Sequence, residues 1–166
     1  MSKKVLVLNT GGTFNKVYDP IKGELVIDEG MIAIKSIANK WQHNLDIVSI
    51  MDKDSLHMNS KDRVEMLSYI YQSEYNDIII IHGTDTMEIS AEYIAEAEVE
   101  KRIVLTGAMV PYSIDPVEAT ANFAMAYGFL QNCTKDGVYI SMNGLVDEFK
   151  NITKDRKKGV FVRVKG

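Results

Sequence analysis

Cysteine is nearly absent from the sequence, which contains only Cys133. A lone cysteine cannot form an internal disulfide, and we interpret Cys133 as a small apolar residue buried on a helix. Histidine and cysteine also form no cluster that could bind a metal ion, so no metal site is predicted.

Long apolar stretches are also missing. No segment approaches the roughly 20 residues that a membrane-spanning helix requires. The run from Val5 to Leu8 is too short for the apolar region of a signal peptide, and it leads directly into a patterned domain. We therefore expect a cytoplasmic protein that has no membrane partner.

The chain lacks a strong charge of either sign, since its net charge is −4. Such a mildly acidic chain has no electrostatic footprint for nucleic acid, and no nucleic-acid partner is predicted. The only basic cluster, Lys154 to Lys158, is interpreted as a solvated loop. A length of 166 residues with a hydrophobic fraction of 46% predicts a single globular domain over residues 1–166.

Short β-branched runs alternate with longer segments of helical pattern, and no internal repeat interrupts them. Strands are predicted at Lys4–Asn9, Asp46–Ile50, Asp77–His82, Arg102–Thr106 and Gly137–Met142, with Val160–Val164 as a candidate edge strand after a mobile Lys-rich piece. Helices are predicted at Met31–Trp41, Lys61–Gln72 (apolar face Val64, Leu67, Ile70 and Tyr71), Thr86–Glu98 (Asp85 as N-cap) and Pro116–Asn132 (Asp115 as N-cap). The alternation predicts an α/β fold: a doubly wound, mainly parallel sheet with helices on both faces, Rossmann-like or flavodoxin-like.

In a doubly wound sheet, ligands bind outside the carboxyl ends of the strands, and the loops there carry alcohol groups. The first loop is Thr10-Gly11-Gly12-Thr13, which lacks both the Walker and the dinucleotide fingerprints and could be a plain turn. The loop after the third strand, His82 to Glu88, places Thr84 beside Asp85 where a helix begins. Asp85 could be only a helix cap, and we interpret His82 as a packed residue at the end of its strand.

A threonine nucleophile needs a neighbouring base, because its hydroxyl has the pKa of an alcohol. A lysine held next to a carboxylate can serve as that base when burial lowers its pKa. Lys150 and Lys154 are the candidates in the last part of the chain.

The two loops resemble the signatures of the bacterial-type L-asparaginase family, which is similar to the glutaminase-asparaginases. TGGT at 10–13 resembles the first signature and HGTDTME at 82–88 the second. The match continues in the right order through 104–111, Asn122, 142–143 and 152–154. The two signatures together are highly specific, whereas either alone would be much less so.

The resemblance implies an amidohydrolase that releases ammonia from L-asparagine or a related small side-chain amide and needs no cofactor. Thr13 matches the nucleophile that forms the acyl-enzyme, and Thr84, Asp85 and Lys154 match a hydroxyl–lysine–carboxylate triad. Tyr18 is a loose match to the family's catalytic tyrosine on the mobile first loop. Ser55 would hold the substrate α-carboxylate and Asp85 its α-ammonium. The resemblance assigns substrate contacts to Gly12, Ser55, Thr84, Asp85, Ala108 and Met109.

The sequence departs from the family pattern in three ways. The second domain, which closes the site in family members, is absent, so the chain is either a one-domain member or a fragment. Leu56 stands where a polar residue is frequent, and Glu118 to Ala121 replaces an acid-and-glycine stretch. We expect a homodimer or higher homo-oligomer to cover the open cleft.

Two further functional interpretations remain open. A degenerate, inactive domain could bind aspartate or asparagine as a sensor or partner subunit. A nucleotide or flavin binder would also suit the fold, although neither phosphate-binding fingerprint is present. All site predictions require that Thr13, Thr84 and Lys154 converge at one edge of the sheet.

Overall fold

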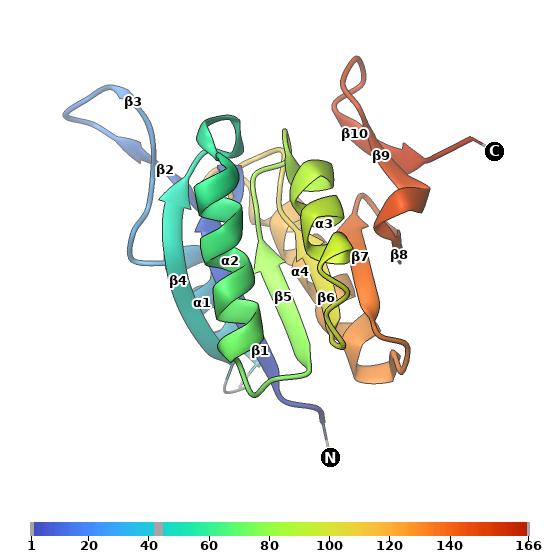
Figure 1. Ribbon diagram of the computed structural model, residues 1–166. Helices are drawn as coiled ribbons and strands as arrows, with labels where there is room; N and C mark the ends of the chain where they lie inside the picture. Colours follow the sequence, from blue (N-terminus) through green and yellow to red (C-terminus); the bar gives the residue numbers. More distant parts are fainter. Residues whose placement is uncertain (1, 42–44, 166) are drawn as a thin grey trace.

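The computed structural model describes residues 2–41 and 45–165, which form a central six-stranded sheet with helices on both faces (Figure 1). The strands follow the order β4-β1-β5-β6-β7-β8. Their bounds are Val5–Gly11 (β1), Asp46–Lys53 (β4), Asp77–Ile81 (β5), Arg102–Thr106 (β6), Gly137–Met142 (β7) and Leu145–Glu148 (β8). All neighbours pair in parallel except β8, which runs antiparallel to β7. The predicted doubly wound, mainly parallel sheet is confirmed.

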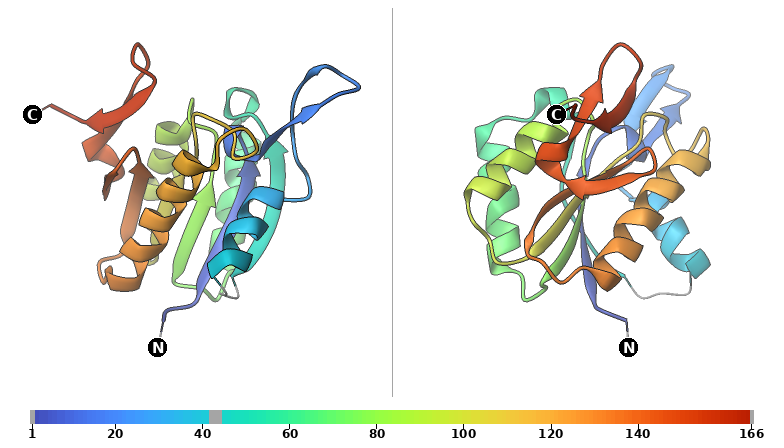
Figure 2. Two further views of the ribbon diagram at one scale, coloured as in Figure 1. Left: turned by 180° about the vertical axis from the view of Figure 1, so that it is seen from behind. Right: turned by 90° about the vertical axis from the view of Figure 1, so that its right-hand side faces the viewer.

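Each face of the sheet has its own apolar core, because alternate strand residues point to opposite sides. Ile78 and Ile80 of β5 pack with helices α2 (Ser60–Gln72) and α3 (Met87–Glu96), whereas Ile79 and Ile81 pack with α1 (Ile32–Trp41) and α4 (Pro116–Asn132). Figure 2 shows the sheet between these two helical layers. The uninterrupted isoleucine run is therefore buried on both faces, as its sequence predicts.

The topology fixes where a ligand crevice forms. From β1 the chain passes through α1 to β4 on one side, and then through α2 to β5 on the other side of β1. The direction of winding reverses between β1 and β5, so the loops at their carboxyl ends diverge to opposite faces. The TGGT and HGTDTME segments begin at these two adjacent strand ends.

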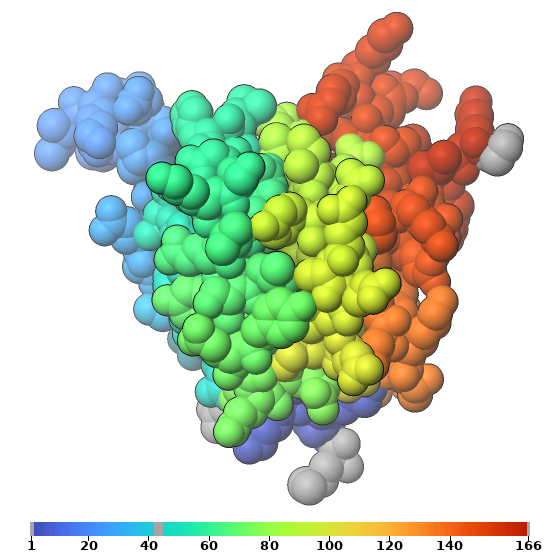
Figure 3. Space-filling view, in the orientation of Figure 1, coloured from blue at the N-terminus to red at the C-terminus, as the bar shows by residue number. Residues whose placement is uncertain are grey.

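Two small hairpins stand at the carboxyl end of the sheet, one at each side (Figures 1 and 3). They are β2–β3 (Lys16–Asp19 and Glu24–Ile27) and β9–β10 (Ile152–Asp155 and Val160–Arg163). Single 3-10 turns precede β2, α2 and β9, at Thr13–Asn15 (η1), Ser55–His57 (η2) and Phe149–Asn151 (η3). The β2–β3 hairpin was not predicted from the sequence.

A strand does form within the predicted range Val160–Val164, but it does not lie at the edge of the central sheet as predicted. The strand, Val160–Arg163, pairs with β9 in a separate hairpin, and β8 takes the edge of the central sheet. The reason is a tight turn at Asn143 and Gly144, both with positive φ, which folds the chain back along β7. The Lys-rich piece is the turn of the β9–β10 hairpin, held by hydrogen bonds from the Lys157 and Lys158 backbone N–H groups to Asp155.

Two local predictions need correction, and a third is confirmed. Asp85 does not cap α3, because Thr86 is the N-cap residue and makes no side-chain capping bond. Asp115 does cap α4, accepting a hydrogen bond from Val117 N at 3.0 Å. Cys133 is the half-buried C-cap residue of α4 rather than a buried helical residue. Within the described residues, no helix is both long and apolar enough to cross a membrane.

The buried face of α2 differs from the predicted one. Val64 and Tyr71 are exposed, and the buried side chains are those of Asp62, Arg63, Met66 and Ile70. The spacing of apolar residues alone predicts the wrong face of α2, because the buried face includes a charged residue, Arg63. Arg63 lies at helical spacing from Met66 and Ile70. Its burial is possible because neighbouring hydroxyls accept its hydrogen bonds.

Candidate active site

Glycines allow three loops to pack against one another at the carboxyl end of the sheet. A Cβ on Gly12, whose φ is 76°, would lie 2.6 Å from Gly83 N, and a Cβ on Gly83 would lie 2.6 Å from Ser55 Oγ. Only glycine permits contacts this close. The loops after β1, β4 and β5 therefore meet, and the first of them places Thr13, the residue after Gly12, at this junction. The glycines of the TGGT segment thus serve close packing as well as a turn.

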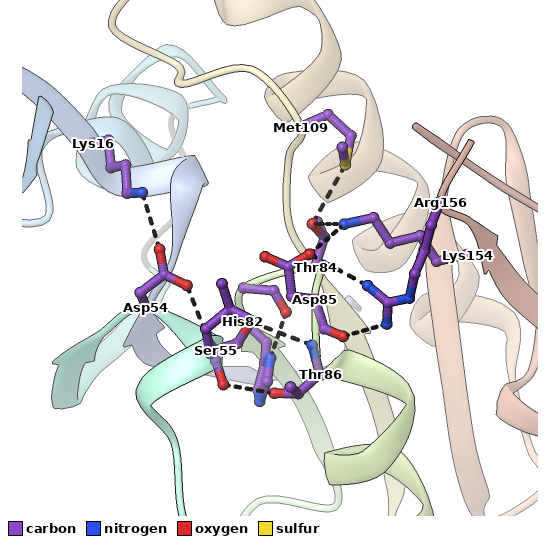
Figure 4. Close-up of polar contacts among 12 residues, drawn as sticks. Lys16, Asp54, Ser55, His82, Thr84, Asp85, Thr86, Met109, Lys154 and Arg156 are labelled. Carbon is purple, nitrogen blue, oxygen red and sulfur yellow. Dashed lines mark hydrogen bonds and ion pairs between the residues drawn. The ribbon is translucent and has the colours of Figure 1, made fainter. Parts of the chain in front are cut away.

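Thr84, Asp85 and Lys154 form one hydrogen-bonded group at this junction (Figure 4). Lys154 Nζ donates to Thr84 Oγ1 at 2.9 Å and to Asp85 Oδ1 at 2.8 Å. The Lys154 side chain is 6% exposed and that of Asp85 34%, so the ion pair is shielded from one side and open to solvent from the other. The predicted convergence of Thr84 and Lys154 is confirmed.

Of the two candidate lysines, Lys150 lies elsewhere. Its ammonium pairs with Glu148 at 3.1 Å, and its side chain is 67% exposed. Lys154 differs because it lies on β9, opposite Phe161, a core residue of β10. The hairpin therefore holds the Lys154 side chain toward the sheet.

Two asparagines connect this hairpin to the rest of the fold. The Phe161 N–H donates to Asn143 Oδ1 at 2.8 Å, and Asn143 N donates to Asn122 Oδ1 at 3.1 Å. Asn122 Nδ2 in turn donates to Gly107 O at 2.9 Å. This series of amide bonds runs from the β6–α4 loop through the β7–β8 turn to the strand opposite Lys154. In the sequence, Asn122 and Asn143 were visible only as parts of the family match.

Arg156 also contacts Asp85, which sequence reasoning missed. Its Nη2 donates to Asp85 O at 2.7 Å, and its Nη1 lies 3.4 Å from Asp85 Oδ1 (Figure 4). The interpretation of Lys154 to Lys158 as a solvated loop is wrong for Lys154, whose side chain is 6% exposed, whereas Arg156, Lys157 and Lys158 are exposed. The β9–β10 hairpin thus places two cations, Lys154 and Arg156, against Asp85.

Ser55 lies on the side of Thr84 and Asp85 that is away from Lys154, and it packs against Gly83 (Figure 4). Its side chain is fully buried, and its Oγ accepts a hydrogen bond from Thr86 N at 3.3 Å. Thr86 Oγ1 donates to Ser55 O at 2.9 Å, which fixes η2 against the start of α3. The next residue, Leu56, is 67% exposed and offers no polar side-chain atom.

A charged pair flanks Ser55 on its other side. Asp54 caps η2 by accepting from Leu56 N at 3.2 Å, and its second oxygen accepts from Lys16 Nζ at 3.0 Å. Burial raises the pKa of Asp54, but the hydrogen bonds from Lys16 and Leu56 outweigh it and hold the pKa below its usual value. This pair joins the β2–β3 hairpin to the β4–α2 connection.

A buried network lies beneath Ser55 and Thr86. Arg63, 8% exposed, donates through Nη2 to Thr86 Oγ1 at 3.2 Å and through Nε to Ser90 Oγ at 3.0 Å. His82 is fully buried, with Nδ1 2.7 Å from Gly83 O and Nε2 2.7 Å from Ser90 Oγ. Burial lowers the pKa of His82 to about 4, so the ring is neutral at pH 7. The interpretation of His82 as a packed strand-end residue agrees with these contacts.

The loop after β6 forms the remaining wall. Thr84 Oγ1 donates to Met109 Sδ at 3.3 Å, and the neighbouring Ala108 is buried. The Glu118 carboxylate accepts from Met109 N at 2.9 Å and from Val110 N at 3.0 Å. Glu118, noted in the sequence as part of an unusual stretch, therefore fixes the loop that covers Thr84.

Thr13 and Tyr18 stand apart from this hydrogen-bonded group. Thr13 is half-buried at the start of η1, whereas Tyr18 is 63% exposed on the projecting β2–β3 hairpin (Figure 1). In the part of the chain that the structure describes, neither side chain makes a hydrogen bond. Gly12 brings Thr13 to the junction, but the structure does not bring Tyr18 to Lys154. The roles of Thr13 and Tyr18 stay predictions.

Comparison with known proteins identifies the family of this chain. The family model "Asparaginase, N-terminal" matches residues 4–160. The chain belongs to the asparaginase family. A probable periplasmic L-asparaginase of Haemophilus influenzae is 31% identical over an alignment of 166 residues, which covers 90% of this chain and 46% of that protein. The L-asparaginase of Thermococcus kodakarensis is 27% identical over 144 residues, which cover 83% of this chain and 43% of that protein.

Solved structures of this family share the fold. The thermostable L-asparaginase from Thermococcus kodakarensis superposes with a TM-score of 0.82 at 24% identity, covering 97% of this chain and 51% of that one. A probable cytoplasmic L-asparaginase from Campylobacter jejuni gives a TM-score of 0.81 at 21% identity, covering 97% and 53%. The asparaginase-family chain described here thus spans about half the length of the relatives that it matches.

Proposed function

We propose that this chain is the nucleophile-bearing half of an amidohydrolase that releases ammonia from L-asparagine or a related small side-chain amide. The observation that carries the proposal is the position of Lys154 Nζ, within hydrogen-bonding distance of both Thr84 Oγ1 and Asp85 Oδ1. A shielded amine between an alcohol and a carboxylate is an arrangement that can move a proton.

In the proposed reaction, Thr13 Oγ attacks the amide carbon of the substrate side chain. The C–N bond breaks, the leaving amine takes up the proton that the hydroxyl gives up, and ammonia departs from an acyl-enzyme. Water then attacks the ester, which releases the acid and restores Thr13. The Lys154 ammonium would hold Thr84 Oγ1 through the hydrogen bond that it donates, and Asp85 balances the charge of that ammonium, so the Thr84 hydroxyl is held in place to relay the Thr13 proton toward the leaving amine.

Binding of the substrate relies on the three packed loops. Ser55 would donate to a carboxylate, and the walls near Gly12, Ala108 and Met109 would enclose the amide. Gly12 N already donates to Lys53 O at 2.9 Å, so this N–H is not available to the oxyanion. The oxyanion would instead be bound by the backbone N–H groups of Thr13 and Thr84. A fixed donor of this kind is worth about 3 kcal/mol in the transition state.

The test is an ammonia-release assay with L-asparagine and L-glutamine on the wild type and three variants. Thr13→Ala and Lys154→Met should each lower kcat at least about 100-fold. Lys150→Met removes the other candidate lysine, which is exposed, and should leave kcat unchanged. Release that persists in both Thr13→Ala and Lys154→Met would overturn the mechanism. Aspartate binding in calorimetry without any turnover would favour the sensor function instead.

We also propose a homo-oligomer and a cytoplasmic location. The open side of Asp85 and the exposed Leu56 support the first, because water in a site weakens its electrostatic contacts. Light scattering should give at least twice the 18.7 kDa mass of one chain. A monomer at the concentration where the enzyme works would exclude the oligomer.

A further inference from the structure

Arg63 is a buried cation whose hydrogen bonds go only to uncharged groups. It lies on α2, is 8% exposed, and donates to two hydroxyls and one backbone carbonyl. The adjacent carboxylate, Asp62, pairs with Lys53 at 2.6 Å, and the described residues give Arg63 no ion pair. A buried cation of this kind favours an anion in its surroundings, because little solvent screens its charge.

A first series of hydrogen bonds leads from Arg63 to Ser55. Arg63 Nη2 lies 3.2 Å from Thr86 Oγ1, which lies 2.9 Å from the carbonyl oxygen of Ser55. A carbonyl oxygen can only accept, so the Thr86 hydroxyl donates to Ser55 and accepts from Arg63. Thr86 N also donates to Ser55 Oγ at 3.3 Å, so Thr86 holds both the backbone and the side chain of Ser55.

A second series leads from the same guanidinium to Gly83. Arg63 Nε donates to Ser90 Oγ at 3.0 Å, Ser90 Oγ lies 2.7 Å from His82 Nε2, and His82 Nδ1 lies 2.7 Å from Gly83 O. Because Gly83 O can only accept, Nδ1 carries the proton of the neutral ring. Nε2 therefore accepts from the Ser90 hydroxyl, and every donor in this series also points away from Arg63.

The two series end at residues that touch each other. A Cβ on Gly83 would lie 2.6 Å from Ser55 Oγ, so the loops after β4 and β5 meet where the two series end. Hydrogen bonds that point in one direction polarise one another. The positive charge of Arg63 therefore acts on both loops at their contact.

The carboxylates next to this contact in the two loops already have cations. Asp54 pairs with Lys16 at 3.0 Å, and Asp85 pairs with Lys154 at 2.8 Å. Each lysine balances the charge of its own partner, so the charge of Arg63 remains available to a further anion.

We propose that Arg63 is a positioning residue whose buried charge, acting through Thr86 and Ser90, favours the carboxylate of the substrate amide at Ser55. This inference rests on the proposed function, in which Ser55 binds that carboxylate. It adds a residue that touches no substrate but holds the two loops that do.

The experiment compares kcat/KM for L-asparagine and for L-asparagine methyl ester, measured as ammonia release at a pH where both keep their ammonium. The ester retains the side-chain amide and lacks the carboxylate, so the ratio of the two values reports the charge that acts on the carboxylate. The wild type should prefer the acid. Arg63→Met should lower this preference about tenfold, the effect of one charge a few hydrogen bonds away at an intermediate dielectric, through a higher KM for L-asparagine.

Two further variants separate the charge from a structural role. Arg63→Gln is a second neutral variant and should give the same ratio as Arg63→Met, with circular dichroism to verify the fold of both. Lys61→Met removes an exposed cation from the same helix and should keep the wild-type ratio. A residue that only stabilised the fold would lower kcat/KM for the acid and the ester equally, so an unchanged ratio in the folded Arg63 variants would overturn the inference.

Added salt gives a readout that needs no variant. Because Arg63 is 8% exposed, salt screens its charge little, and the wild-type preference should change less than about twofold between 0.05 and 0.5 M NaCl. A preference that collapses in salt would come from exposed cations such as Arg156 and would also overturn the inference. In either case, ammonia release by the wild type would uphold the proposed function. Absence of ammonia from both amides would instead refute the proposed function, and this inference with it.

Discussion

Lys154 Nζ lies 2.9 Å from Thr84 Oγ1, although 70 positions separate the two residues in the chain. The contact joins the loop after β5 to a hairpin that follows the last strand of the central sheet along the chain. Neither element places both groups by itself, so the contact depends on the docking of β9–β10 against the β7–β8 turn. Catalysis and the position of the hairpin are therefore coupled.

Thr84→Val tests the alcohol of this pair. Valine keeps the shape of threonine but can neither accept from Lys154 nor donate to Met109 Sδ. We expect kcat for ammonia release to fall at least about 100-fold while the circular dichroism spectrum stays unchanged. Thr134→Val, in an exposed loop beyond α4, removes the same group and should have no effect. Equal losses in both variants would remove Thr84 from the mechanism.

Gly83→Ala tests whether close packing of the loops holds the site together. The added Cβ would lie 2.6 Å from Ser55 Oγ and 2.9 Å from Ser55 N, so η2 must shift. We expect a loss of about 1–3 kcal/mol in the free energy of unfolding, together with weaker substrate binding. Gly128→Ala, inside α4 with nothing within 4 Å of its Cβ, should instead stabilise the protein by roughly 0.5–1 kcal/mol. Urea unfolding of both variants decides the point.

The central sheet could be predicted from the sequence because its strands are buried on both faces. Four consecutive isoleucines, Ile78 to Ile81, are favourable only in a strand that is covered on both faces. Because helices connect the consecutive strands, only a few sheet topologies are possible. The β2–β3 hairpin could not be predicted, since its strands are short and half-exposed, and its pairing depends on a single turn near Gly23. Local patterns therefore identify core elements better than peripheral ones.

In the candidate site, too, some residues could be predicted from the sequence and others could not. Thr84, Asp85 and Lys154 could be named because two specific signatures resemble a known family. Arg156 could not, because a basic run reads as a solvated face until a partner is known. Arg63 did leave a signal: it lies three and seven positions before Met66 and Ile70, on the face that turns out to be buried. A charged residue at core spacing indicates a buried polar network.

Asn143→Gly tests the coupling between the hairpin and catalysis. Glycine tolerates the φ of 51° at this position, so the variant removes the side chain, and with it the oxygen that accepts from Phe161 N, without straining the turn. We expect a loss of about 1 kcal/mol in stability and faster hydrogen exchange of the Phe161 amide. Because Phe161 pairs with Lys154, kcat should fall more than KM rises. Asn132→Ala, an exposed amide at the end of α4, is the control and should change neither exchange nor kcat.

The buried imidazole of His82 makes the stability of the protein depend on pH. Burial lowers its pKa from 6.5 to about 4 in the folded state. The unfolded chain therefore binds more protons between these values, and stability, complete above pH 6.5, is lost as pH falls toward 4. Between pH 7 and pH 5 the free energy of unfolding should drop by about 2 kcal/mol. At pH 5 most carboxylates are still ionised, so His82 accounts for most of the change.

Substitution of His82 separates this contribution from the others. Glutamine can donate to Gly83 O and remains uncharged, so His82→Gln should be less stable at pH 7 but should lose the slope between pH 5 and pH 7. His57→Gln, at an exposed position, should keep the wild-type slope. Urea unfolding at intervals of half a pH unit measures both. A slope that persists in His82→Gln would mean that another group takes up the proton on unfolding.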